Sequence, residues 1–109
     1  MRWARLPEIS KLLYNIAMDQ EQLESVFEDK YRKLLGETLE GWLKRAPQTE
    51  EQAFARCMAI DRELNASYDE WFDAAGGKKD KLQEHRDKLK AEYDLIEEMF
   101  HLEANDRDW

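Results

Sequence analysis

The sequence predicts an all-α protein, an antiparallel three-helix bundle, and three observations support this prediction. Of the 109 residues, 39% are charged, and only four are Gly and two are Pro, a composition typical of chains built from long, exposed helices. Apolar residues recur at spacings of three and four, which is helical periodicity, and no stretch alternates as a strand does. Capping and stop signals divide the chain into long helices at about 7–45, 50–75 and 79–104.

The course of the first helix has two readings. Pro7 stands at a first-turn position, where proline favours a helix start. Asp19, followed three residues later by Gln22, is a possible N-cap that would split the helix near Asp19. At 100° per residue, however, an unbroken helix keeps one apolar azimuth from the amino-terminal segment through Leu23, Phe27, Tyr31, Leu34 and Trp42, so the phase favours continuity. The apolar residues before the junction are Ile9, Leu12, Leu13 and Ile16.

The second and third helices have clearer boundaries. Thr49 and Gln52 form a capping box that starts a helix at Glu50, and the pair Gly76-Gly77 is expected to end it. The expected apolar stripe of the second helix consists of Phe54, Cys57, Met58, Leu64, Tyr68, Trp71, Phe72 and Ala75. That of the third helix consists of Leu82, Leu89, Tyr93, Ile96 and Phe100.

Length and composition bound the class of protein. A chain of this length makes one domain, 1–109, with irregular tails at 1–6 and 105–109. The single cysteine, Cys57, allows no intramolecular disulfide, and no apolar run approaches the length of a membrane span, so we expect a cytoplasmic protein that does not enter a membrane. The net charge of −8 opposes direct binding to nucleic acid, which is driven by cation contacts with phosphates.

No motif indicates catalysis. Glu98 and His101 have the i,i+3 spacing of a helical metal-binding pair, but both fall opposite the apolar stripe of their helix, and a di-metal bundle needs more carboxylates facing inward. Both are therefore expected to be exposed and without metal. His85 has no cysteine or serine placed as its nucleophile. The sequence predicts no enzyme, no cofactor and no metal site.

One carboxylate interrupts the apolar pattern. Asp61 falls within the apolar arc of the second helix, at about the same height as Tyr31 and Tyr93 on the flanking helices. Because a carboxylate in a core must find partners, we expect a polar contact among these three residues. A contact with a ligand or partner is the alternative.

Apolar residues left over after the core is assigned predict interfaces. Ile9, Leu12, Leu13 and Ile16 would overhang the bundle in a continuous first helix, which predicts a two-fold homodimer through this segment. A second predicted surface lies at the end of the bundle near the 46–48 turn, unless a chain terminus covers it. Its residues are Leu39, Leu43, Leu95 and Leu102.

These features predict a non-enzymatic, acidic, helical interaction protein that self-associates and binds or inhibits a larger protein partner, as an adaptor or inhibitor does. The twelve aromatic residues exceed what a slender three-helix core must use, and aromatic residues are favoured at interfaces. The alternative is a mimic of nucleic acid that occupies the basic groove of a DNA- or RNA-binding protein. Only the net charge favours it, because acidic runs are mixed with Lys and Arg. A long autonomous coiled coil is not established, because the heptad pattern of the third helix is short.

Overall fold

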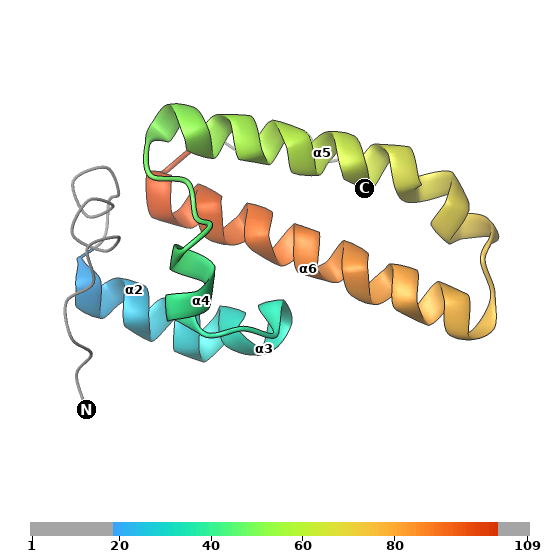
Figure 1. Ribbon diagram of the computed structural model, residues 1–109, viewed down its shortest axis with the longest axis horizontal. Helices are drawn as coiled ribbons and strands as arrows, with labels where there is room; N and C mark the ends of the chain where they lie inside the picture. The colour runs from blue at the N-terminus through green and yellow to red at the C-terminus, as the bar shows by residue number, and fades with distance from the viewer. Residues whose placement is uncertain (1–18, 103–109) are drawn as a thin grey trace.

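The fold is all-helical, as the sequence predicts. The computed structural model describes residues 19–102 (Figure 1), and this part of the chain contains no strand. Three main helices, at 20–35, 50–73 and 76–100, pack together. The elements are α2 (Gln20–Val26), the π-helical turn η1 (Phe27–Tyr31), α3 (Arg32–Leu35), α4 (Leu39–Leu43), α5 (Glu50–Asp73) and α6 (Gly76–Phe100).

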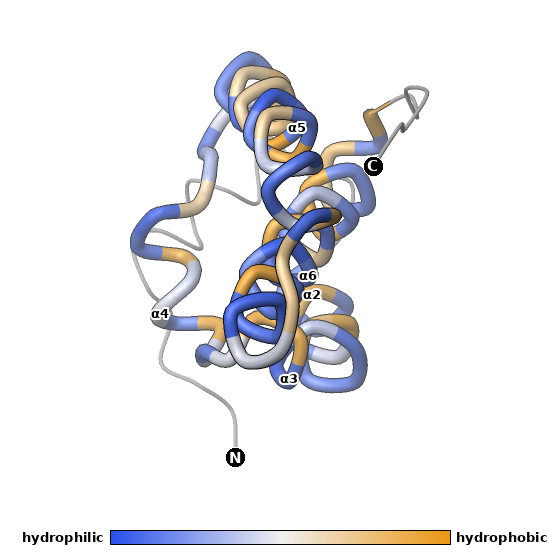
Figure 2. Tube along the Cα trace, turned by 90° about the vertical axis from the view of Figure 1, so that its right-hand side faces the viewer, coloured by the Kyte–Doolittle hydropathy of each residue, from blue (hydrophilic) through white to orange (hydrophobic). Residues whose placement is uncertain are grey.

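Helix α6 is the centre of the bundle. It forms an antiparallel hairpin with α5, and the rod made by α2, η1 and α3 lies along its other side (Figures 1 and 2). Hydrophobic and hydrophilic residues alternate along the helices in Figure 2, as expected for amphipathic helices that bury one face. Because α6 has neighbours on two sides, it buries more residues than either partner.

Helix α2 begins directly after Asp19, so a helix continuous through this residue was the wrong reading, and the alternative of a fresh helix start there is confirmed. Asp19 has an extended backbone (φ −80°, ψ 176°). Its carboxylate accepts from the backbone N–H of Gln22 at 2.8 Å, and the Gln22 side chain accepts from the backbone N–H of Asp19 at 3.0 Å. This reciprocal capping box satisfies backbone donors that have no intrahelical partner. It sets the start of the helix, although the apolar spacing in the sequence would also fit a helix that continues through Asp19.

A second break, at Gly36, was not predicted. The rod ends there because Gly36 adopts the left-handed conformation (φ 70°), and its N–H bonds back to the Arg32 carbonyl at 3.0 Å. Thr38 then caps α4, since its hydroxyl accepts from the N–H of Gly41 at 3.1 Å. The expectation of one helix reaching residue 45 is therefore wrong, and α4 turns away from the rod as a separate short helix.

The boundaries of α5 and α6 differ less from expectation. Thr49 caps α5 by accepting from the Gln52 N–H at 3.1 Å, as predicted. Helix α5 ends at Asp73, and Gly76 and Gly77 are the first two residues of α6 rather than its preceding loop. Gly76 has a positive φ of 63°, which lets the chain reverse direction at the first residue of α6.

One hydrophobic core joins all the main helices. From α5 it takes Ala53, Cys57, Ile60 and Leu64, whereas Phe54 and Phe72, which the sequence placed on the core stripe, are 54% and 63% exposed. Among residues 19–102, no helix is both long and apolar enough to cross a membrane. The core contains Leu23, Phe27, Tyr31, Leu35, Leu39, Trp42, Leu43, Ala46, Ala53, Cys57, Ile60, Leu64, Leu89, Ala91, Tyr93, Leu95, Ile96, Met99 and Phe100.

Candidate functional site

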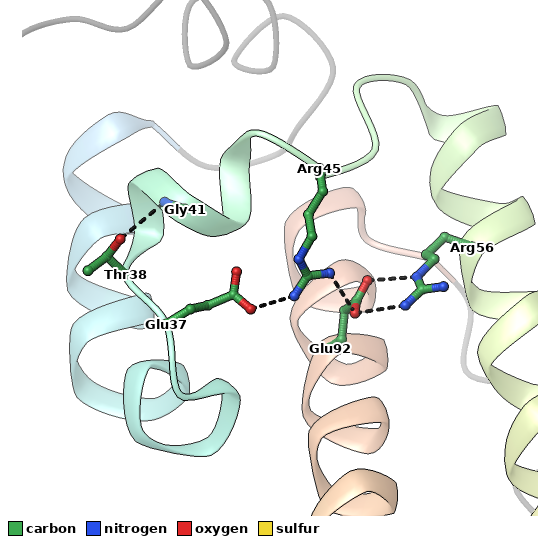
Figure 3. Close-up of polar contacts among 6 residues, drawn as sticks. All are labelled: Glu37, Thr38, Gly41, Arg45, Arg56 and Glu92. Carbon is green, nitrogen blue, oxygen red and sulfur yellow. Dashed lines mark hydrogen bonds and ion pairs between the residues drawn. The ribbon is translucent and has the colours of Figure 1, made fainter.

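A buried carboxylate on α6 holds three segments together (Figure 3). Glu92 is 4% exposed. Its Oε2 accepts from Nε of Arg56 on α5 at 2.8 Å, and its Oε1 accepts from Nη1 of Arg45, just after α4, at 3.0 Å. Arg45 also donates from Nη2 to Oε2 of Glu37 at 2.6 Å. This ionic cluster fixes the α4–α5 connection onto the hairpin.

The charge state of Glu92 argues against an acid–base role. Burial alone raises the pKa of this carboxyl, but the hydrogen bonds and positive charge of Arg56, and then of Arg45, outweigh burial and lower the pKa below its usual value. A general acid or base works best with a pKa near the operating pH. Glu92 stays ionised at neutral pH, so the cluster acts as a structural clamp.

A second buried charge, Arg86, lies farther along α6 and is 2% exposed. Its Nη1 donates to the carbonyl of Leu64 and to the hydroxyl of Ser67, both at 2.7 Å. The guanidinium also lies 5.4 Å from the ring centre of Trp71 and 5.7 Å from that of Tyr68, within the range of cation–π attraction. The buried Arg86 guanidinium therefore packs against the Tyr68 and Trp71 rings.

Sequence reasoning missed both buried charges, although a signal was present. Arg86 stands four residues after Leu82 and three before Leu89, and Glu92 stands three after Leu89 and four before Ile96. These are the spacings of the buried stripe. A charge at such a position must either be paired within the fold or lie at a site, and here both are held by contacts within the fold.

An aromatic cluster occupies the end of the hairpin formed by α5 and α6. The Tyr68 ring stacks on Phe72 with centres 6.0 Å apart and lies 5.7 Å from Trp71. The Lys79 ammonium lies 4.9 Å from the Trp71 ring centre. We call these residues, with Arg86, the tip cluster: Tyr68, Trp71, Phe72, Lys79 and Arg86.

Apart from the buried Arg86, the tip cluster is not covered by the rest of the described chain. The rod on the other side of α6 reaches only as far as Gly36, whose nearest neighbour on α6 is Lys88, and Figure 1 shows the hairpin extending well beyond α3. From residue 65 to residue 85, which we call the tip, no residue is buried. Tyr68 is 40% and Phe72 is 63% exposed, so large apolar area faces water where two helices stand without a third.

A pocket of about 450 Å³ lies at the opposite end of the hairpin. Its lining comes from the first turns of α5, from the last turns of α6 and from the two residues that follow α6. The lining residues are Glu50, Phe54, Cys57, Tyr93, Glu97, His101 and Leu102.

The structure separates Glu98 from His101. His101 is exposed, as expected. Glu98 is only half-exposed, because its Oε2 accepts from the Tyr31 hydroxyl at 2.8 Å and lies 3.8 Å from Nζ of Lys30. The prediction of full exposure was wrong for Glu98, since it treated α6 as packed on one side only, whereas the rod covers a second side.

The predicted contact of Asp61 with Tyr31 and Tyr93 stays a prediction. Both tyrosines are buried and Asp61 is half-buried, which agrees with a place at the margin of the core. The Tyr31 hydroxyl donates to Glu98.

The predicted interfaces have different outcomes. Leu39, Leu43 and Leu95 are buried in the core, so the exposed leucine patch near the 46–48 turn was wrong. The break at Gly36 redirects α4 so that its leucines face inward, and the second side of α6 is covered. Leu102 is partly buried against the same core. The segment with Ile9, Leu12, Leu13 and Ile16 lies outside the described residues.

No outside comparison assigns a site. No protein-family model, no curated protein and no solved structure matches this chain. Within residues 19–102, no group of three or more His, Cys, Asp or Glu side chains is placed to hold a metal ion. The function must therefore be inferred from what the described side chains present to solvent.

Proposed function

We propose that this chain is a non-enzymatic interaction protein that binds a larger protein partner through the tip cluster. The observation that carries this proposal is the stack of exposed aromatic rings on a hairpin end that no other helix of residues 19–102 covers. Trp, Tyr and Arg are the residue types that most often dominate binding energy at protein interfaces. Here Tyr68 and Trp71 lie in one contact network, with Phe72 as its most exposed member.

The arrangement favours binding over a purely structural role for the rings. Trp71 and Tyr68 are sufficient to cover Arg86 and so to close the hairpin. Phe72 makes no cation–π contact with Arg86, and 63% of its surface is exposed. Rings held by neighbours lose little conformational entropy on binding, which makes them efficient anchors.

A pull-down with matched variants tests the proposal. The tagged full chain, the double variant Tyr68→Ala/Phe72→Ala and the control Phe54→Ala are each incubated with lysate of the source organism, and captured proteins are identified by mass spectrometry. Phe54 is a fair control, because it is another exposed phenylalanine on α5, far from the tip. We expect a partner that the wild type and Phe54→Ala capture and the double variant loses.

Two checks complete this experiment. Far-UV circular dichroism of all three proteins must show the same helix content, so that a loss of binding is not a loss of fold. A partner retained by the double variant but lost by Phe54→Ala would overturn the proposal and move the binding surface to the pocket end of the hairpin.

Self-association is proposed separately, through Ile9, Leu12, Leu13 and Ile16. The capping box at Asp19 removes the continuous helix on which the overhang argument relied, but four apolar residues at helical spacing still favour burial against another surface. Light scattering of the wild type and of Leu12→Asp/Ile16→Asp is the test. A dimer that the variant converts to a monomer supports the proposal, and a wild-type monomer at micromolar concentration overturns it.

A further inference from the structure

The pocket at the packed end of the hairpin combines buried and exposed apolar walls. Among its lining residues, Tyr93 and Cys57 are almost fully buried, whereas the Phe54 ring is 54% exposed. Phe72, the matching exposed phenylalanine on α5, does not line this pocket. A cavity of about 450 Å³ is large enough to receive a big side chain or a small ligand, and a ring exposed at its wall favours an apolar occupant.

The chain itself turns toward this pocket where α6 ends. His101, the residue after the helix, adopts the left-handed conformation (φ 52°). The backbone N–H of Leu102 then bonds to the carbonyl of Glu97 at 3.3 Å, which folds the chain back over the last turn of α6. His101 and Leu102 both line the pocket. The segment that follows, residues 103–109, therefore starts at the edge of the pocket.

The reversal at His101 needs support from contacts beyond it. A Cβ disfavours the left-handed conformation, and helices usually place Gly at this position. Strain of this kind persists where the surrounding structure holds it in place. Leu102 packs partly against the core, which supplies some of this support, and a contact made by the following segment would supply more.

We propose that residues 103–109 fold back into this pocket and that the Trp109 ring packs against Phe54. This inference goes beyond the proposed function, because it concerns the end of the hairpin opposite the tip cluster. Trp109 is the only large apolar residue in the segment, whose sequence is EANDRDW. Seven residues span at most about 25 Å when extended. Because Leu102 itself lines the pocket, the ring reaches Phe54 with chain to spare.

Burial of the ring, and not net charge, drives this contact. Glu50 and Glu97 line the pocket, and the segment contains three acidic residues and one arginine, so like charges oppose docking. Burial of a large aromatic side chain offsets this repulsion. Arg107, the single cation of the segment, lies toward the two carboxylates. The tether favours the segment over a free ligand, since a linked group has an effective concentration on the order of millimolar.

Hydrogen exchange of the full chain, followed by mass spectrometry, tests the inference. The synthetic peptide EANDRDW gives the rate of unprotected amides. We expect the amides of residues 103–109 in the wild type to exchange at least tenfold more slowly than in the peptide. Phe54→Ala and Trp109→Ala should each remove most of this protection. The matched control, Phe72→Ala, should leave it unchanged, because Phe72 is an exposed phenylalanine of the same helix far from the pocket.

The salt dependence distinguishes ring burial from ion pairing. Raising the salt concentration to about 0.5 M screens the repulsion between the acidic segment and the acidic pocket wall. The protection of residues 103–109, relative to the peptide, should therefore increase. A decrease with salt would show that ion pairs hold the segment, and the argument from ring burial would be wrong.

The single cysteine gives a second measurement. Cys57 lines the pocket and is 3% exposed. Alkylation of its thiol by N-ethylmaleimide should be at least fivefold faster in Trp109→Ala than in the wild type, because the pocket is then open. Trp109→Phe, which keeps a ring, should retain most of the slow rate, and Phe72→Ala should match the wild type. Circular dichroism of every variant verifies that the fold is intact.

Three results would overturn the inference. Exchange of residues 103–109 at the peptide rate in the wild type would show that the segment is not docked. Protection that survives both Phe54→Ala and Trp109→Ala would place the segment elsewhere. Protection that grows with protein concentration would mean that the pocket receives the segment of a second copy. The proposed function is judged separately, by partner capture with Tyr68→Ala/Phe72→Ala, so either proposal can fail alone.

Discussion

The two ends of the hairpin formed by α5 and α6 consist of the same pair of helices but differ in what surrounds them. At the packed end, the rod and α4 cover α6, the core residues are fully buried, and even the charges there are paired around Glu92. At the tip, no third helix is present among the described residues, and no residue from 65 to 85 is buried. The buried Arg86 beside it is held by the carbonyl of Leu64 and the hydroxyl of Ser67 instead of a carboxylate.

This difference separates stability from binding. Burial of apolar area is the main favourable contribution to folding, and it is concentrated at the packed end. Exposed apolar rings contribute little to folding, and on a small protein they mark a surface for another molecule. The packed end therefore determines whether the chain folds, and the tip is free to carry the interaction that we propose. The predictions below test this division in order of expected size.

The largest difference in stability is expected between two Trp→Ala variants, one at the packed end and one at the tip. Trp42 is fully buried and Trp71 is half-buried, and in both the indole N–H is buried without an acceptor among the described residues. The pair therefore differs mainly in packing. Trp42→Ala should lower the free energy of unfolding by about 3 to 5 kcal/mol, and Trp71→Ala by about 1 to 2 kcal/mol. Urea denaturation followed by circular dichroism measures both, and equal losses would contradict the division.

The next effect concerns the ionic cluster and depends on pH. Glu92→Gln should destabilise the protein by about 1 to 3 kcal/mol at pH 7, because the hydrogen bonds from Arg45 and Arg56 then no longer end on a charged acceptor. The loss is limited because both arginines are partly exposed and can be hydrated instead. Because the folded pKa of Glu92 is lowered, its contribution is complete above the unfolded value of about 4.3 and is lost as the pH falls below that value toward the folded pKa.

The difference in stability between wild type and Glu92→Gln should therefore shrink when the pH is lowered from 7 to 3. Denaturation curves of both proteins across this range give the answer. A difference that stays constant or grows toward acid pH would show that Glu92 does not contribute through its charge.

The two ends of α6 offer a smaller test with opposite signs. Gly76 at the tip and His101 at the packed end both have positive φ values, 63° and 52°. Gly76→Ala should cost about 1 to 2 kcal/mol, because a Cβ disfavours this conformation, and no atom lies close enough for a clash. His101→Gly should gain about 0.5 to 1 kcal/mol, since relief of strain exceeds the added entropy of the unfolded chain. Thermal unfolding of each variant measures the sign.

The smallest expected change in stability is at the tip surface. Phe72→Ala should alter the free energy of unfolding by no more than about 0.5 kcal/mol, the usual range for exposed sites, and Phe54→Ala should behave alike. Only Phe72→Ala should weaken capture of the partner. A loss above 1 kcal/mol for Phe72→Ala would mean that the ring is needed to hold the hairpin, and its exposure would then no longer argue for binding.

Much of the helix pattern could be predicted from local residues. Thr49 with Gln52 marks a helix start that depends on neighbouring backbone groups alone, and the structure has it at the predicted position. The signals at Asp19 with Gln22 and at Gly36 with Thr38 are equally local. The first was seen but given less weight than the apolar phase, and the second was missed because the same phase continues across it. A cap ends or starts a helix over a few residues. The helical spacing of apolar residues, in contrast, can by chance stay in register on both sides of such a break.

The sequence by itself determined that the chain is helical, where most helices begin, and that aromatic residues exceed the needs of the core. Only the tertiary structure decided which of them remain exposed. Leu95 and Glu98 on α6 and Phe72 on α5 were misassigned because an azimuth describes one helix in isolation. Burial depends on the number of neighbours. Helix α6 is covered on two sides along its carboxyl-terminal half, whereas between Gly76 and Lys88 it has α5 alone among the described elements.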